Sequence, residues 1–234
     1  MAPTKTASEP KMIIRRYISI SATLHLLRTG ELFLLDPQTW DDRNDRYFMS
    51  LYKAARQRQS LYALCGTLAN ETYHHWRVFT GSSDGACLEI HRLPFEAHLR
   101  TLDGVRFGPM EYLDLKEMEQ LGPTDADRLP FLKRLGFKAE NEYRVIADSN
   151  EPQAPAMTIP VDLSWVGRVH INPWLPQTLA DSVKATLRSI PGCEKLSVTR
   201  SALIENTRWK RAGDIVAGQA SAATATVKSL AKDL

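Results

Sequence analysis

The segment Lys133–Ala147, with the sequence KRLGFKAENEYRVIA, constrains the fold of this chain most strongly. In its second half, charged residues occupy every second position: Glu140, Glu142 and Arg144. Side chains along a β-strand alternate between its two faces, so a strand here would place these charges on one face. Two carboxylates and a guanidinium are costly to bury without partners, so this face suits the wall of a cleft. We therefore expect a strand at Glu142–Ala147 with a site on its charged face.

Further strands are predicted where short runs rich in β-branched and aromatic residues lie between turn signals. Those expected to share a central sheet with the charged strand are Met12–Ile20, Leu61–Thr67 and Ala86–His91. Shorter strands are expected at 32–35, 157–161, 166–171 and 197–200. Helical patterns interleave with the strands irregularly. The sequence therefore predicts an α+β fold, a single domain with a central mixed, mostly antiparallel sheet flanked by helices.

Helices are predicted from capping residues and from apolar residues at helical spacing. Ser21 is expected to cap the first helix, which Gly30 closes. The expected helical ranges are 22–28, 47–59, 71–79, 93–100, 115–122, 126–135 and 177–189. We expect the folded domain to span residues 12–211, after a flexible lead at 1–11. Residues 212–234 are rich in Ala, Ser, Thr and Lys, which predicts a flexible low-complexity tail.

Composition narrows the class of protein. With 43% hydrophobic residues, the chain of 234 residues can bury the core of one domain. A net charge of +3 is too small to predict a strong nucleic-acid footprint. The three cysteines form no CxxC pair, which argues against a disulfide framework or structural zinc and favours a reducing cytoplasm. No apolar run approaches the roughly 20 residues that cross a bilayer, so no membrane partner is expected. The oligomeric state is left open.

The acidic segment 40–45, WDDRND, is a first candidate site. Its carboxylates could coordinate a hard cation such as magnesium or calcium, although the spacing does not fit an EF-hand. Asp and Asn also favour turns and helix N-caps, and this structural interpretation is the stronger one. The histidines show no metal-like pairing either.

Two further patterns have both a functional and a structural interpretation. Trp76 and Phe79, one helical turn apart, could form a stacking wall for a planar ring or belong to the core. The pair Glu140 and Glu142 could hold a ribose hydroxyl and position a nucleophile. Alternatively, Glu142 and Arg144 could form ordinary salt bridges on an exposed strand face. The residues alone leave these alternatives open.

Taken together, the ordered elements resemble an uncharacterised bacterial family known as domain of unknown function 2971. Its pattern runs from an aromatic first strand to a basic residue followed by an E-x-E-Y/W-R strand. The matching residues, within roughly 12–147, are Tyr17, Gly30, Trp40, Asp42, Asn44, Asp45, Cys65, Trp76, Phe79, Gly85, Cys87, Glu89, Lys133, Glu140, Glu142, Tyr143 and Arg144. Two positions depart from the pattern. Phe79 stands where tyrosine is common, and Gly66-Thr67 where Phe-Ser is common.

That family is similar to ADP-ribosyltransferases and occurs near phage-defence genes, so the resemblance implies an NAD-consuming protein of bacterial defence. Such enzymes use an Arg or His, a Ser or Thr, and a glutamate on successive strands, and Arg16, Thr67 and Glu142 occur in this order. The resemblance implies that Arg16 holds the dinucleotide phosphates and that Thr67 orders the site. It implies that Glu142 bonds the nicotinamide-ribose 2′-hydroxyl and stabilises a cationic transition state.

The resemblance also assigns the remaining site residues. Glu140 would orient the acceptor, with Arg144 as the third charged residue of the catalytic strand. Tyr17 belongs to the implied NAD site, and Trp76 or Phe79 would stack on the nicotinamide. NAD is the implied cofactor, and no metal is expected. The absence of a GxGxxG sequence excludes a Rossmann-type NAD site.

Two other classes of function remain open. One is a metal-dependent nuclease that would use Asp42, Asp45, Glu140 and Glu142, although the small net charge attracts a polyanion weakly. The other is a non-catalytic defence module that binds a partner or a nucleotide. The expected partner is a nucleotide or small-molecule ligand, and the macromolecular acceptor or partner is undefined.

Overall fold

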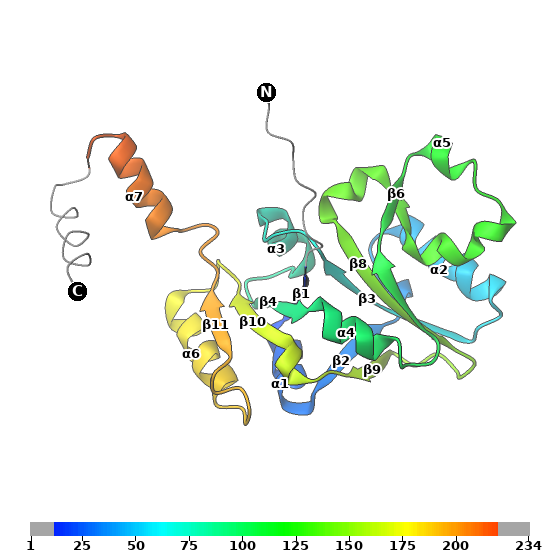
Figure 1. The fold of residues 1–234 in the computed structure, drawn as a ribbon, viewed down its shortest axis with the longest axis horizontal. Helices are drawn as coiled ribbons and strands as arrows, with labels where there is room; N and C mark the ends of the chain where they lie inside the picture. Colours follow the sequence, from blue (N-terminus) through cyan, green and yellow to red (C-terminus); the bar gives the residue numbers. More distant parts are fainter. Residues whose placement is uncertain (1–11, 220–234) are drawn as a thin grey trace.

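A nine-stranded sheet forms the centre of the structure, a computed structural model that describes residues 12–219 (Figure 1). All of its pairings are antiparallel except that of β10 with β11. The predicted α+β fold, with a mixed, mostly antiparallel sheet flanked by helices, is confirmed. The strands are β1 (Ile13–Ser19), β2 (Glu31–Leu35), β3 (Ser60–Thr67), β4 (Gly85–His91), β5 (Val105–Pro109), β8 (Glu142–Ser149), β9 (Ala156–Pro160), β10 (Val166–Ile171) and β11 (Ser197–Arg200). The expected lead at 1–11 and residues 220–234 of the expected tail lie outside the described residues.

The sheet consists of two halves that meet at one point. One half has the order β11, β10, β4, β1, and the other contains β5, β8, β3, β2 and β9. Between β1 and β3 the register holds a single pair, Arg15 with Thr67. Gly66 lies against β1 there, and a Cβ atom at this position would come within 2.7 Å of Ile14 Cγ2. The halves therefore diverge from this junction, and the start of β8 lies beside it because Thr67 pairs with Glu142.

Helices cover both faces of the sheet (Figure 1). They are α1 (Ile20–Thr29), α2 (Arg43–Ala55), α3 (Tyr73–Phe79), α4 (Arg92–Leu99), α5 (Leu115–Met118), α6 (Gln177–Arg188) and α7 (Thr207–Val216). Tyr143 and Val145 of β8 point into the main core with α1 and α4, whereas Ile146 packs with Met49 and Tyr52 of α2. The predicted alternation along β8 is thus real, and its even-numbered side chains face α2.

A second, two-stranded sheet lies beside α5. It pairs β6 (Glu111–Leu113) with β7 (Leu132–Arg134). Four 3-10 helices complete the fold, namely η1 (Pro37–Thr39), η2 (Pro123–Phe131), η3 (Leu135–Glu140) and η4 (Leu163–Trp165). The segment η2–β7–η3 carries the chain from α5 to the start of β8.

Several local predictions are wrong. The helix expected at 126–135 is a 3-10 helix and a strand, because Pro130 lacks an N–H group for a regular helix. Glu140 does not lie on the strand with Glu142, because Asn141 between them takes a left-handed conformation. The first helix is capped by Ser19, whose side chain accepts from the N–H of Ala22, and Ser21 lies inside the helix.

Two elements have different ends from those predicted. The helix expected at 47–59 begins earlier, at Arg43, and the one expected at 115–122 ends at Met118.

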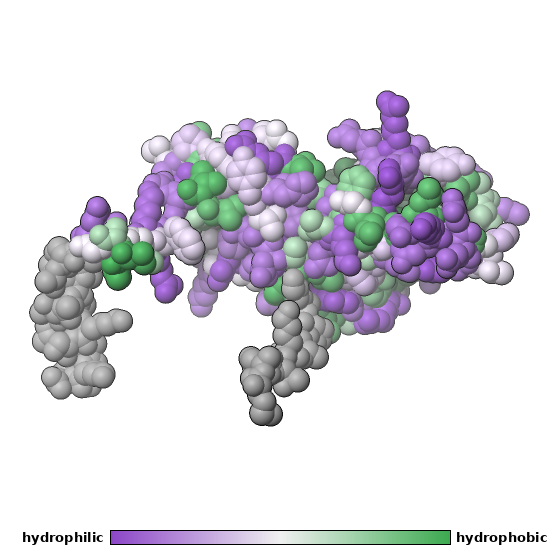
Figure 2. All heavy atoms as spheres, turned by 90° about the horizontal axis from the view of Figure 1, so that it is seen from above, coloured by the Kyte–Doolittle hydropathy of each residue, from purple (hydrophilic) through white to green (hydrophobic). Residues whose placement is uncertain are grey.

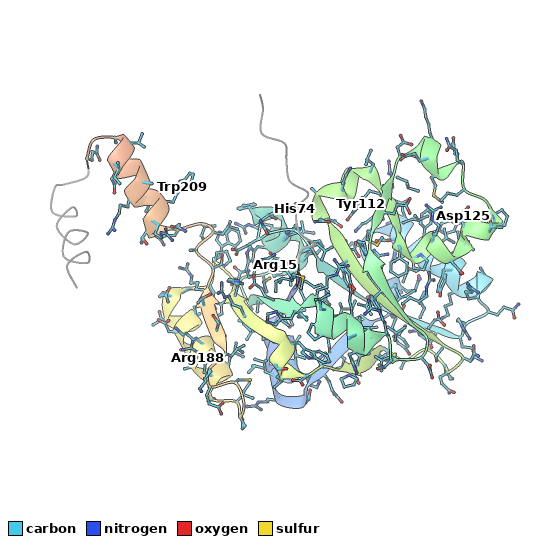
Figure 3. The ribbon with its side chains drawn as sticks, viewed as in Figure 1. Arg15, His74, Tyr112, Asp125, Arg188 and Trp209 are labelled. Atoms are coloured by element: carbon cyan, nitrogen blue, oxygen red, sulfur yellow. The ribbon has the colours of Figure 1, made fainter. Side chains whose placement is uncertain are left out.

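Helix α7 crosses the domain boundary expected at residue 211. It stands away from the sheet, with every described side chain exposed, and Trp209 is 82% exposed (Figures 2 and 3). Among residues 12–219, no helix is long and apolar enough to cross a membrane.

Candidate functional site

Arg144 is the centre of a buried ion network on the face of the sheet covered by α2. Its guanidinium donates to both carboxylate oxygens of Asp45, at 3.0 and 2.8 Å, and to Glu142 Oε1, at 2.8 Å. It also donates to the carbonyl of Pro130, at 2.8 Å. The side chain is 0% exposed, and the ring of Trp40 lies 4.7 Å from the guanidinium carbon. Arg144 therefore joins β8 to α2 through a bidentate ion pair.

Lys133 is the second cation of this network and comes from β7. Its Nζ atom lies 2.5 Å from Glu140 Oε2, 2.9 Å from Glu142 Oε2 and 3.6 Å from Asp45 Oδ2. An ammonium group has three N–H donors. Here it donates to Glu140 and Glu142, and Asp45 lies just beyond hydrogen-bond distance. The network thus contains three carboxylates and two cations, and every carboxylate has at least one cationic partner.

Glu140 reaches the network from η3. Asn141 follows it with φ of 44°, a conformation that asparagine adopts more readily than most residues. The hydroxyl of Thr67 donates to the carbonyl of Glu140 at 2.6 Å, and the ring of His75 lies 3.2 Å from the same oxygen. These contacts hold the backbone of Glu140 so that its carboxylate lies beside Lys133.

The two glutamates differ in acidity. Burial alone would raise the pKa of Glu142, but the charges of Arg144 and Lys133 outweigh it and lower that pKa from 4.5 to about 2. At Glu140 burial prevails and raises the pKa. Glu142 therefore stays ionised, and Glu140 is the one that takes up a proton more readily. Neighbouring carboxylates with pKa values pushed apart suit a division between electrostatic stabilisation and proton transfer.

Six of the eight residues predicted for the site line one cavity, which we name the Glu142 cavity. They come from β1, β3, α3, η3 and β8, and are Arg16, Tyr17, Thr67, Phe79, Glu140 and Glu142. Arg15, Cys65 and Gly66 also contribute to the lining. The cavity thus lies at the junction between the two halves of the sheet, near Arg15 in Figure 3.

Two buried polar atoms of this lining have no partner within residues 12–219: Arg16 Nε and the hydroxyl oxygen of Tyr17. Arg16 is held against β3 by a hydrogen bond of 2.6 Å from Nη1 to the carbonyl of Cys65. Burial lowers the pKa of Arg16 and raises that of Tyr17. A buried polar group without a partner costs on the order of 1–3 kcal/mol, so these two atoms call for water or a ligand. The cavity has a volume of about 30 Å³, which is about the share of one water in the liquid.

Arg144 and Trp76, the other two predicted residues, lie outside the cavity. Arg144 is enclosed between Glu142, Asp45 and α2, and so faces no open cleft. Trp76 belongs to a small core cluster, where its indole N–H donates to Glu71 at 2.7 Å and its ring meets that of Tyr17 edge to face. Phe79 lies in the lining and is 39% exposed. Of the two aromatics, Phe79 is therefore the one that lines the cavity.

The acidic segment has the structural role that was the stronger alternative. Asp42 caps α2 by accepting from the N–H groups of Asn44 and Asp45, and Asp45 is paired with Arg144. In the described part of the chain, no group of three or more His, Cys, Asp or Glu side chains is arranged to hold a metal ion. Asp45, Glu140 and Glu142 are paired with Lys133 and Arg144, which are cations of the protein itself.

Sequence reasoning missed several members of the site. Lys133 was recognised only as the basic residue before the E-x-E strand, and Asp45 only as part of an acidic turn, of the family pattern and of the nuclease alternative. Tyr112 of β6, labelled in Figure 3, was not singled out, yet its hydroxyl accepts the N–H of Glu142 at 2.7 Å. His75 was considered only as a metal ligand. A long-range partner of this kind leaves no local signal, because the residues that contact Glu142 come from four separate elements.

Comparison with known proteins gives few matches. No protein-family model matches the chain, and no curated protein sequence matches it. Among solved structures, the chain is similar to DarT from Thermus sp. 2.9, in complex with ADP-ribosylated ssDNA and in complex with NAD+. Both have 13% sequence identity, with TM-scores of 0.44 and 0.42, and the match covers 85% and 84% of this chain and 98% of the DarT chain. With TM-scores below 0.5, this likeness assigns neither a family nor an activity to the chain.

Proposed function

We propose that the Glu142 cavity binds NAD and that the chain breaks the bond between nicotinamide and ribose, as an ADP-ribosyltransferase or an NAD glycohydrolase. One observation carries the proposal: residues from five elements converge on one cavity, beside a carboxylate that stays ionised. The unpartnered atoms of Arg16 and Tyr17 in the same lining favour a ligand with several hydrogen-bonding groups.

The reaction uses Glu142 for electrostatic stabilisation. The bond from ribose C1′ to the nicotinamide nitrogen breaks, nicotinamide leaves with the electron pair, and positive charge develops on the ribose. Glu142 is buried and its pKa is about 2, so its negative charge is already in place when this cation forms. Lys133 and Arg144 hold its two oxygens in position at 2.9 and 2.8 Å, and each oxygen still has a lone pair for a ribose hydroxyl.

Glu140 completes the reaction as the proton acceptor. Water or an acceptor group attacks C1′, and its proton passes to Glu140 as the new bond forms. Burial raises the pKa of Glu140 and makes it the stronger base of the two glutamates. Thr67 acts as a positioning residue, because its hydroxyl fixes the backbone of Glu140.

Binding requires the cavity to open. A volume of about 30 Å³ is large enough for a water molecule and far too small for nicotinamide riboside. Phe79 is an exposed residue of the lining. Rotation of its side chain would enlarge the entrance. A single backbone pair joins β1 to β3 beside the cavity, so this junction resists separation less than a full ladder would. NAD is therefore expected to bind by a change of conformation.

The test combines NAD titration with release of nicotinamide by wild type and by Glu142→Gln. The wild type should bind NAD and release nicotinamide, and Glu142→Gln should lose about two orders of magnitude in turnover. The variant should also melt at a lower temperature, because Glu142 is paired with both cations of the network. Loss of turnover must therefore be separated from loss of fold, and assays should be run well below the melting temperature.

Glu96→Gln is the matched control. Glu96 is a buried carboxylate, 7% exposed, with Arg92, Arg100 and Tyr143 as partners, and it does not line the cavity. It should destabilise the chain in a similar way and leave turnover per folded molecule unchanged. A wild type that neither binds NAD nor releases nicotinamide would contradict the proposal and favour a non-catalytic partner-binding module.

The resemblance seen in the sequence supplies the proposed setting, a bacterial anti-phage system in the cytoplasm. The three cysteines are free in the structure, which suits a reducing compartment. The acceptor of the ADP-ribosyl group is not defined by the cavity.

A further inference from the structure

A larger cavity lies on the opposite side of the ion network, and we name it the α5 cavity. It has a volume of about 480 Å³ and is enclosed by the start of α2, by α5 and by the segment from β7 to η3. These elements lie together at one end of the molecule (Figure 1). The volume falls within the range of small-molecule sites, roughly 300–1,000 Å³.

The walls of the α5 cavity are mainly apolar. Phe48, Leu113, Met118 and Leu132 line it from four different elements. Such a lining suits the flat or aliphatic body of a small ligand. Hydrogen bonds and ion pairs to a ligand must come from the charged residues that also line the cavity.

Two carboxylates in the lining have oxygen atoms available. Asp42 caps α2 through Oδ1, and Asp114 caps α5 through Oδ1. Within residues 12–219 no protein hydrogen bond reaches Oδ2 of either residue. A carboxylate accepts hydrogen bonds and cannot donate them when ionised, so both oxygens select a ligand with N–H or O–H donors.

The charge around the α5 cavity favours a cation. Lys133 and Asp45 form its inner wall, with one positive and one negative charge. Asp42 and Asp114 add two more negative charges, against the single exposed guanidinium of Arg134. The Glu142 cavity is different, because two arginines from β1 balance the two glutamates in its lining. The ion network therefore separates a cavity with more carboxylates than cations in its lining from one in which the two are equal in number.

We propose that the α5 cavity is a second ligand site, which binds a small amphipathic cation: an amidinium, guanidinium or ammonium group on an apolar body. Asp42 and Asp114 bind the cationic group, and Phe48, Leu113 and Met118 contact the apolar body. This site is separate from the Glu142 cavity and needs no NAD, so its test is independent of the proposed function.

Benzamidine is a suitable probe, since it joins an amidinium to a planar ring. Calorimetric titration should show saturable binding to the wild type, and binding to Asp42→Asn/Asp114→Asn should be about tenfold weaker or more, as expected for the loss of charge-assisted hydrogen bonds. Asparagine caps helices as well as aspartate does, so this double variant should keep its fold. Asp162→Asn is the matched control, because Asp162 caps η4 through the same kind of bond and lies outside the cavity.

Two further measurements make the test decisive. Benzyl alcohol, a neutral analogue, should bind much more weakly than benzamidine, and Met118→Trp should block benzamidine by filling the cavity while keeping its charges. The proposal is overturned if benzamidine does not bind at millimolar concentration, or if the double variant or Met118→Trp binds it as tightly as the wild type. Equal binding of benzyl alcohol would overturn the assignment of a cationic ligand.

Discussion

Removal of Asp45 should destabilise the chain severely, because it breaks the ion pair of Arg144, the most buried member of the ion network. In Asp45→Ala, Arg144 Nη2 loses its only acceptor in the described chain and Nη1 keeps only the carbonyl of Pro130. Arg144 is 0% exposed, and a water molecule in place of the carboxylate would carry no charge to balance the guanidinium. Breaking a buried pair in this way costs about 3–5 kcal/mol, a large part of the roughly 5–15 kcal/mol of a typical domain.

Urea unfolding at pH 7 should measure this cost, with Asp125→Ala as the control. Asp125 pairs with Arg128 on the surface, so its loss should move the urea midpoint far less. Arg144→Met and the double variant Asp45→Ala/Arg144→Met complete a thermodynamic cycle. The double variant should cost much less than the sum of the two single changes, since neither charge is then left alone. A cost below about 1 kcal/mol for Asp45→Ala, or additive costs in the cycle, would refute the reasoning.

Three other predictions concern separate parts of the chain. The pKa of Glu142 is about 2 in the folded protein and 4.5 ordinarily. The ionised carboxylate therefore contributes about 3 kcal/mol to the free energy of unfolding at neutral pH, and this contribution should disappear as pH falls from about 4.5 to about 2. The urea midpoints of wild type and Glu142→Gln should then converge in acid. Gly66→Ala should cost about 1–3 kcal/mol, because the new Cβ atom would lie 2.7 Å from Ile14 Cγ2 and 3.2 Å from the carbonyl oxygen of Arg15; an unchanged melting temperature would show that β1 and β3 can separate freely. Trp209→Ala should leave stability within about 0.5 kcal/mol, because that side chain is 82% exposed, and a larger loss in thermal melting would mean that α7 packs against something in solution.

Most of the fold was predictable because strands and helices produce periodic patterns of apolar residues over short stretches of sequence. The runs at β1, β3, β4 and β8 alternate or cluster apolar residues over distances that one element spans, and each was placed within one or two residues. The wrong predictions fall where the backbone conformation of single residues, and no repeating sequence pattern, decides the local structure. The left-handed Asn141 and the short 3-10 helices around Pro130 have no periodic pattern to detect.

The amino-acid sequence by itself determined which residue types stand on the central strands, and its resemblance to a known family implied a shared site for Arg16, Thr67 and Glu142, which line the Glu142 cavity. It could not determine that Asp45 and Lys133 meet Arg144 and Glu142, because Asp45 and Arg144 are 99 residues apart in the chain and only the packing of α2 on the sheet brings them together. Tertiary structure also decided the acidities. The same side chain, glutamate, has a lowered pKa at position 142 and a raised one at position 140, because two cations flank the first and burial dominates at the second. Such differences arise from three-dimensional distances between charges, which no local pattern encodes.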